Sequence, residues 1–83
     1  MLICQVKGSI ISTRKNEKLT GCKFMIVEPL PSGQSFVAVD NVGAGVGETV
    51  LVVQGSGARA AYSPDMPVDA AIVGIIDEGT YSV

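Results

Sequence analysis

The chain carries few residues of the types that catalysis uses, and their spacing does not assemble a site. It has no histidine, so Ser56 and Ser63 lack the base that most often activates a serine hydroxyl as a nucleophile. All four lysines precede residue 24, and none shares a recognisable motif with either serine. We therefore predict that the protein is not an enzyme, and that Ser56 is a hydrogen-bonding residue of a loop or a helix cap.

Two carboxylates, Asp69 and Asp77, flank a predicted strand and are expected at its opposite ends. Carboxyl groups held apart in this way make a poor acid and base pair, because both must reach the same substrate. Asp69 follows Pro67 and Val68, a pattern typical of a turn residue whose side chain accepts backbone N–H groups. We predict a structural role for it.

The glycine-rich segment Gly43–Gly47, followed by Glu48, has the composition of a phosphate-binding loop. Such a loop needs a strand before it, a long helix after it and usually a lysine. Here a strand is predicted to follow and no lysine is near, so we interpret the segment as a tight structural loop. Two cysteines without histidine cannot supply the four ligands of a structural zinc site. No metal or cofactor is expected.

The elements that position these residues are predicted to be short strands. Apolar and β-branched runs separated by turn-forming residues indicate five of them, over Leu2–Thr13, Cys22–Leu30, Ser35–Asp40, Thr49–Gln54 and Ala71–Ile76. Residues Ala58–Ala61 are good helix formers and fit one or two turns. Because glycines let short strands turn sharp corners, we expect a single all-β domain over residues 1–83, a small five-stranded OB-like β-barrel with one short helix.

The composition predicts that this barrel associates with other copies. A chain of 83 residues hides only about 60% of the surface that its unfolded form exposes. Of its residues 47% are hydrophobic and only 17% charged, against about a quarter charged in ordinary soluble domains. The segments Val50–Val53 and Ile72–Ile76 are apolar on both faces, and we expect the outer face to be covered by another copy.

Charge is unevenly distributed along the chain, whose net charge is −2. Five bases and one acid lie in the first 23 residues, whereas the remainder has Arg59 alone against seven acids. This polarity can orient the basic part of one subunit toward the acidic part of its neighbour, or the basic residues 14–18 can form a solvated loop. Arg59 is a candidate to pair Asp40 or Glu48 across a subunit boundary, with an intrachain ion pair or a solvated side chain as alternatives.

Other functional classes receive less support. The N-terminal residues lack a basic segment followed by a long apolar run, and no apolar stretch approaches the roughly twenty residues of a spanning helix. We expect a cytoplasmic protein with no membrane partner. A small barrel of this kind can also be a nucleic-acid or small-ligand binding module, which remains the alternative. Four scattered aromatic residues and a negative net charge argue against nucleic-acid binding.

Four segments in order along the chain carry a family resemblance: residues 8–13 (GSIIST), 39–48 (VDNVGAGVGE), 55–59 (GSGAR) and 67–77 (PVDAAIVGIID). Together they resemble the EutN/CcmL family of bacterial microcompartment proteins. The resemblance implies a barrel that assembles as a homo-pentamer, caps the five-fold vertices of a microcompartment shell in the cytoplasm, and meets hexameric shell proteins at its edges. Two departures are Gly57, where the family commonly has a second serine, and a short tail at Gly79–Val83.

The resemblance also places a narrow opening at the centre of the ring. Either glycine-rich loop, Gly43–Gly47 or Gly55–Gly57, is a candidate to line it. The candidate pore or subunit-interface residues are therefore Gly43, Ala44, Gly45, Val46, Gly47, Glu48, Ser56, Gly57 and Arg59.

Overall fold

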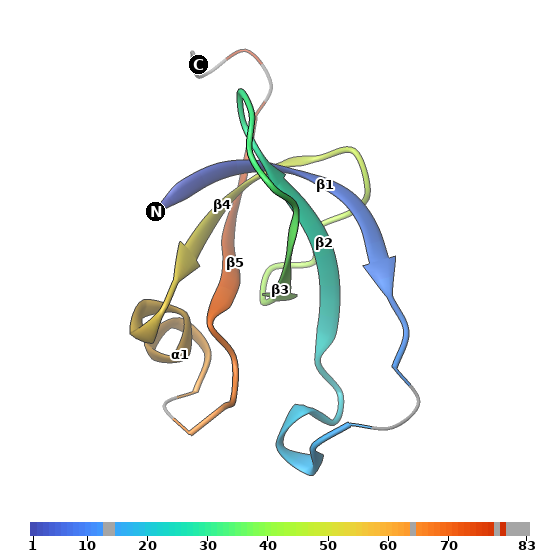
Figure 1. Cartoon of the computed structure of the whole chain (residues 1–83), viewed down its shortest axis with the longest axis vertical. Helices are drawn as coiled ribbons and strands as arrows, with labels where there is room; N and C mark the ends of the chain where they lie inside the picture. Colours follow the sequence, from blue (N-terminus) through green and yellow to red (C-terminus); the bar gives the residue numbers. More distant parts are fainter. Residues whose placement is uncertain (13–14, 64, 78, 80–83) are drawn as a thin grey trace.

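The computed structural model describes residues 1–12, 15–63, 65–77 and 79, and it is a closed barrel of five strands (Figure 1). The strands are β1 (Leu2–Ile10), β2 (Lys23–Pro29), β3 (Phe36–Asp40), β4 (Thr49–Gln54) and β5 (Ala70–Ile76). One α-helix, α1 (Ser56–Tyr62), and one 3-10 turn, η1 (Glu17–Leu19), complete the described elements. The predicted five-stranded barrel with a short helix is confirmed.

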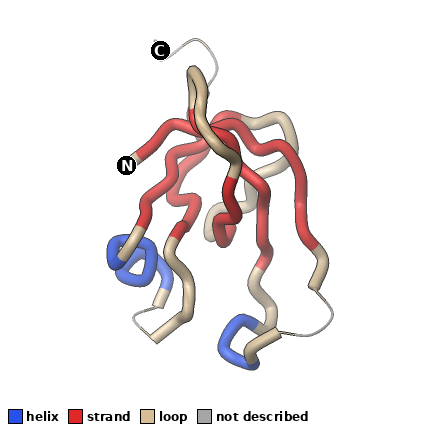
Figure 2. The backbone as a smooth tube through the Cα atoms, in the orientation of Figure 1, coloured by secondary structure: helices blue, strands red, loops and turns tan. Residues whose placement is uncertain are grey.

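Closure of the barrel depends on one short parallel pair. The order around the barrel is β1-β2-β3-β5-β4, and all neighbours are antiparallel except β3 and β5. These two pair only at Val39 with Ala71 and at Asp40 with Ile72. Figure 2 shows the strands wrapping round a common interior, with the helical elements at one end of the molecule.

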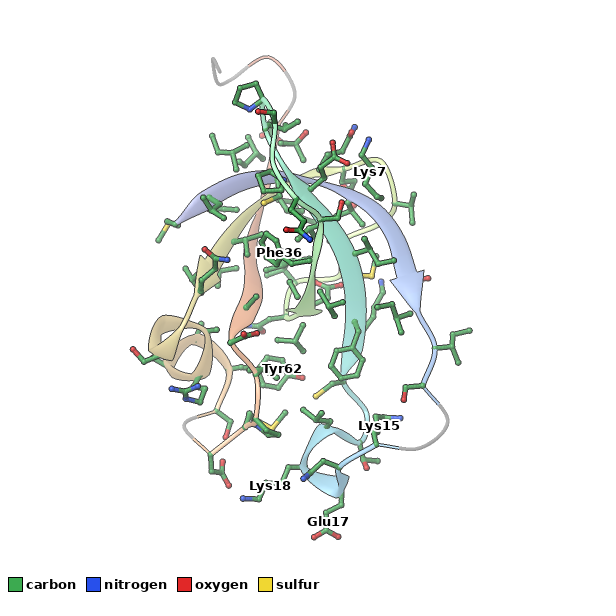
Figure 3. All side chains as sticks on the ribbon, viewed as in Figure 1. Lys7, Lys15, Glu17, Lys18, Phe36 and Tyr62 are labelled. Carbon is green, nitrogen blue, oxygen red and sulfur yellow. The ribbon has the colours of Figure 1, made fainter. Side chains whose placement is uncertain are left out.

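The barrel interior holds one apolar cluster, built from alternate residues of the strands. Cys4, Val27, Val50, Val52 and Ile72 are completely buried there. Phe36 packs against this cluster from the end of the barrel, near the centre of Figure 3. Most of these completely buried side chains are β-branched, a type that favours strands.

A second apolar cluster lies outside the barrel, beneath α1. Val39 and Ala71 point outward from the closing strands, and Ala58 of the helix covers them together with Met66 and Val68. This cluster explains part of the two-faced apolar pattern, because Val53 of β4 also packs here. The expectation that only another copy covers the outer face is therefore wrong for this part of the surface.

Several element boundaries differ from the predicted ones. The first strand ends at Ile10, because Ile10 pairs with Phe24 and β2 begins only one residue before that partner; Thr13 lies outside the described residues. The helix begins at Ser56 and reaches Tyr62, so it is longer than predicted. Its start is set by Gly55, whose φ of 65° turns the chain from β4 into the helix. No helix among the described residues is long and apolar enough to span a membrane.

Candidate functional site

The loop formed by residues 41–48 is organised around the carboxylate of Asp40. Oδ1 accepts the N–H groups of Val42 at 3.0 Å and Gly43 at 3.1 Å, and Oδ2 accepts that of Ala44 at 2.8 Å. The Asp40 side chain is only 1% exposed. A buried carboxylate is tolerated when its oxygens are hydrogen-bonded, and here the backbone of the following loop supplies those bonds.

Lys23 at the start of β2 completes this network. Its Nζ lies 3.5 Å from Asp40 Oδ2 and donates to the carbonyl of Ala44 at 2.9 Å. Because the Lys23 side chain is 52% exposed, water screens much of the attraction between the two charges. The backbone N–H groups, which are themselves partly or fully buried, are therefore the main partners of the carboxylate.

The C-terminal end of the loop forms hydrogen bonds with β1 and also within the loop. Gly47 N donates to Val6 O at 2.8 Å, and Val6 N donates to Glu48 O at 2.9 Å, which extends the β1–β4 ladder into the loop. Gly45 N donates to Glu48 Oε1 at 2.7 Å. Ala44 is fully buried, whereas Val46 is 63% exposed. The predicted tight structural loop is confirmed, with one apolar side chain at its surface.

Gly55–Gly57 was predicted as a second glycine-rich loop, but only Gly55 is a turn residue, because α1 begins at Ser56. Gly55 N donates to Asp69 O at 2.7 Å, which fixes the turn against the approach to β5. Ser56 and Gly57 are exposed. Ser56 was predicted to be a hydrogen-bonding residue of a loop or a helix cap; the N-cap is instead Gly55, without a side-chain hydrogen bond, and Ser56 is the first residue of α1.

The two loops lie at opposite ends of β4. Gly47 and Glu48 directly precede the strand and Gly55 directly follows it. A six-residue strand spans about 20 Å, at about 3.3 Å per residue. The two loops of one subunit are thus too far apart to line the same narrow opening.

The other predicted site residues have local partners. Arg59 Nη1 donates to the carbonyl of Val68 at 3.3 Å, and within the described part of the chain it pairs neither Asp40 nor Glu48. Asp69 and Asp77 do flank β5, as predicted. Asp69 contributes its backbone carbonyl to Gly55 rather than its carboxylate to a turn, because its side chain points to solvent.

Asp40 and Lys23 are the structural residues that sequence reasoning missed in this role. An aspartate at the end of a strand, followed within three residues by glycine, is a signal for a turn in which the side chain accepts the following N–H groups. That signal is present in residues 40–43. The contribution of Lys23 has no local signal, because 17 residues separate it from its partner.

Titratable groups with shifted pKa values are scattered over the molecule. Burial raises the pKa of the Cys4 thiol inside the barrel. The hydrogen bond with Cys22, 3.6 Å from Sγ to the hydroxyl, raises the pKa of Tyr62 at the end of α1. The Ser63 hydroxyl, 2.8 Å away, lowers the pKa of the exposed Asp65. These groups do not converge on one cavity, and the part of the chain that the structure describes brings no three metal-ligating side chains together.

Comparison with known proteins identifies what the whole barrel resembles. Residues 1–77 match the family described as "Ethanolamine utilisation protein EutN/carboxysome". The microcompartment shell vertex protein GrpN of Rhodospirillum rubrum is 47% identical over 93% of each chain, and the carboxysome shell vertex protein CcmL of Thermosynechococcus vestitus is 46% identical over 93% of this chain and 84% of its own.

Solved structures extend this similarity to the fold. The pentameric shell protein MSM0273 from the RMM microcompartment has a TM-score of 0.88 and 39% identity, over all of this chain and 98% of its own. The structure of the pentameric GrpN gives a TM-score of 0.82 with 44% identity, over 93% and 94% of the two chains. With its matching residues spread over nearly the whole barrel, the chain belongs to the EutN/CcmL family.

Proposed function

We propose that this protein is a structural subunit of a bacterial microcompartment shell, and that five copies form a closed ring at a five-fold vertex. The observation that carries the proposal is the full-length similarity to pentameric shell proteins, with a TM-score of 0.88 over the entire chain. Flat arrays of six-fold tiles do not close, whereas five-fold units introduce curvature. The ring occupies the cytoplasmic shell, and its edges meet hexameric shell proteins.

The local structure supports a role without catalysis. The Asp40 carboxylate accepts hydrogen bonds that fix the backbone of residues 42–44, which is a structural role. The described aromatic residues do not gather into one stacking platform: Phe36 packs on the inner cluster, Phe24 packs on the outer one, and the Tyr62 hydroxyl is hydrogen-bonded to Cys22. A stacking platform is what an OB-like nucleic-acid binder needs, so the binding-module alternative is less well supported.

The central opening of the ring is lined by Gly55–Gly57 rather than by Gly43–Gly47. Gly43, Gly47 and Gly55 have positive φ, so their own backbone conformation requires them. A Cβ atom at Gly45 would lie 3.3 Å from Glu48 Oε1, which is a tight contact. Gly57 is helical and exposed, and a Cβ atom there would meet only Val53 Cβ, at 4.0 Å. Glycine in a helix costs about 1 kcal/mol relative to alanine. We attribute the glycine at position 57 to a close approach of neighbouring subunits at the axis of the ring.

The remaining candidate residues then have separate roles. Ser56 and Gly57 lie at the opening, and Arg59 on the same helix supports it through Val68. Residues 43–48, comprising Gly43, Ala44, Gly45, Val46, Gly47 and Glu48, form a rigid interface loop at the other end of β4. Val46 is its exposed apolar contact.

Substitution of Gly57 tests the assignment of the opening. We expect Gly57→Leu to weaken the ring or to close its opening, because five side chains would meet at the axis. Ala60→Leu, also exposed and on the same helix, is the matched control and is expected to leave the ring intact. The measurement is electron microscopy of the assembled ring together with sedimentation. A Gly57→Leu ring with an unchanged opening would exclude this loop.

Sedimentation of the unmodified protein tests the function itself. We expect a species of about 43 kDa, five chains of 8.6 kDa each, at micromolar concentration, and its incorporation at vertices when hexameric shell proteins are coexpressed. A salt series shows how far the uneven charge orients the subunits. A stable monomer that binds single-stranded nucleic acid would instead favour the alternative function.

A further inference from the structure

One apolar face of the barrel is centred on β4 and is only partly covered by the chain itself. Ile3, Leu51 and Gly74 lie side by side across β1, β4 and β5, in register with one another. Leu51 points outward, since its neighbours Val50 and Val52 lie in the inner cluster. Ile76 follows one row further along. We name this set, Ile3, Leu51, Gly74 and Ile76, face A; all four residues are half-buried.

A second apolar face is centred between β2 and β3. Gly8, Ile26 and Val37 lie in register across β1, β2 and β3, and Phe24 belongs to the next row. Ile26 points outward because Met25 and Val27 lie in the inner cluster. We name Gly8, Phe24, Ile26 and Val37 face B. A groove of about 140 Å³ adjoins it, lined mainly by apolar residues that include Phe24 and Val37.

The two faces lie on opposite sides of the barrel. In the closed order β1-β2-β3-β5-β4, the boundary between β2 and β3 is as far as possible from β4. Figure 1 shows β4 and β2 on different sides of the molecule. Face A lies outside the part of the surface where α1 packs, over Val53 and Ala71; of face B, Phe24 also packs against this outer cluster.

Each face contains a glycine at which the surrounding chain leaves room for a Cβ atom. Gly8 and Gly74 lack positive φ, and each lies at a shift in strand register. A Cβ atom would be 3.7 Å from Ile26 Cδ1 at Gly8 and 3.8 Å from Leu51 Cβ at Gly74, which are ordinary contact distances. Glycine within a strand often marks a bulge, as the register shifts indicate here, or a place where another backbone approaches closely. At Gly8 face B has no side chain, and at Gly74 face A has none.

Symmetry determines how such faces can be used. A five-fold ring has no two-fold axis between neighbours, so every contact joins two different patches of the same chain. We infer that face A of one subunit packs against face B of the next, with the Leu51 row meeting the Val37 row. The inference rests on the proposed pentamer and specifies which two surfaces build it. Opposite placement lets each subunit contact two neighbours at once.

Single substitutions on each face test the pairing. We expect Leu51→Arg and Val37→Arg each to convert the pentamer into monomers, because a charge placed in an apolar contact is left without a partner. Gln34→Arg, exposed in the connection between β2 and β3 and outside both faces, is expected to remain pentameric. Circular dichroism checks folding; where a variant is unfolded, Ile3→Arg replaces the first and Ile26→Arg the second.

Mixing the two monomeric variants tests the head-to-tail arrangement. ¹⁵N-labelled Val37→Arg retains face A, and unlabelled Leu51→Arg retains face B, so together they can form one interface and no ring. We expect amide shifts at Ile3, Leu51 and Gly74 of the labelled protein. Adding unlabelled Val37→Arg to labelled Val37→Arg is expected to cause none, since both lack face B.

The outcomes separate this inference from the proposed function. If the unmodified protein is monomeric, the pentamer itself fails. If it is pentameric and both face variants remain pentameric, the ring is real and the assignment of its surfaces is wrong. Shifts located on α1 or on residues 43–48 instead of face A would likewise overturn the pairing.

Discussion

Replacing Asp40 with alanine is expected to lower the free energy of unfolding by about 3 to 4 kcal/mol. The substitution removes the acceptor of three backbone N–H groups, those of residues 42, 43 and 44. It also leaves Lys23 without its ion-pair partner. Each buried donor without an acceptor costs about 1 to 3 kcal/mol, and the outermost of these N–H groups can recover water. Urea unfolding at matched subunit concentration measures the loss, since oligomer stability depends on concentration.

Two control variants identify the source of that loss. Lys23→Ala is expected to cost about 1 kcal/mol or less, because the ammonium group is half exposed and screened. Asp69→Ala removes an exposed carboxylate without a side-chain hydrogen bond in the described structure, and is expected to change stability by about 0.5 kcal/mol or less. Equal losses for Asp40→Ala and Lys23→Ala would mean that the ion pair, rather than the loop amides, carries the stabilisation.

The strands were predictable because they depend on local patterns. Runs such as Val50–Val53 and Phe36–Val39 combine β-branched residues with turn signals on both sides, and the structure places strands on both. Their pairing order was not predictable from the residues, because it depends on contacts between distant segments. The parallel pair that closes the barrel joins Asp40 to Ile72 across 32 residues, and no local signal specifies that partner.

The sequence predicted where the loops of the site lie better than it predicted which contacts hold them. The first glycine-rich segment is a turn, as its composition indicated, whereas only Gly55 of the second is a turn residue and Ser56 and Gly57 begin α1. Positive φ at Gly43 and Gly55 gives the physical reason for the two turns. The sequence could not show that Asp40 fixes the first loop together with Lys23. It also could not show that Ala58 of α1 packs with Val53 and Ala71 on the outer surface of the barrel, because these contacts join segments that are distant in the sequence.

Charge polarity along the sequence has a partial counterpart in space. Lys15 and Lys18 lie at one end of the molecule, where Glu17 accompanies them, whereas Lys7 lies toward the other end (Figure 3). The charge of Lys18 also contributes to lowering the pKa of Asp65, which is hydrogen-bonded to Ser63. The basic N-terminal segment therefore does not form one uniform patch, because η1 mixes both signs within three residues. The apolar contact proposed between faces A and B is therefore a stronger basis for subunit association than this uneven charge.

Replacing Ile72 with alanine is expected to lower the free energy of unfolding by about 3 kcal/mol. Ile72 is completely buried in the inner cluster. It pairs with Val52 of β4 on one side and with Asp40 of β3 on the other, so it lies at the closure of the barrel. Strands on both sides hold the space open, which prevents the surroundings from collapsing into the cavity. Urea unfolding at several subunit concentrations separates this loss from any change in assembly.

Its matched control lies on the same strand. Ile75 is 41% exposed, so Ile75→Ala is expected to cost about 1 kcal/mol or less in the subunit. Ile72→Val removes one methyl group and is expected to cost about 1 kcal/mol. A loss at Ile75 as large as that at Ile72 would mean that the exposed end of β5 is as well packed as the barrel interior. Because the described chain covers Ile75 only partly, such a loss in the ring would have to come from a neighbouring subunit, and it would then decrease as the rings dissociate on dilution.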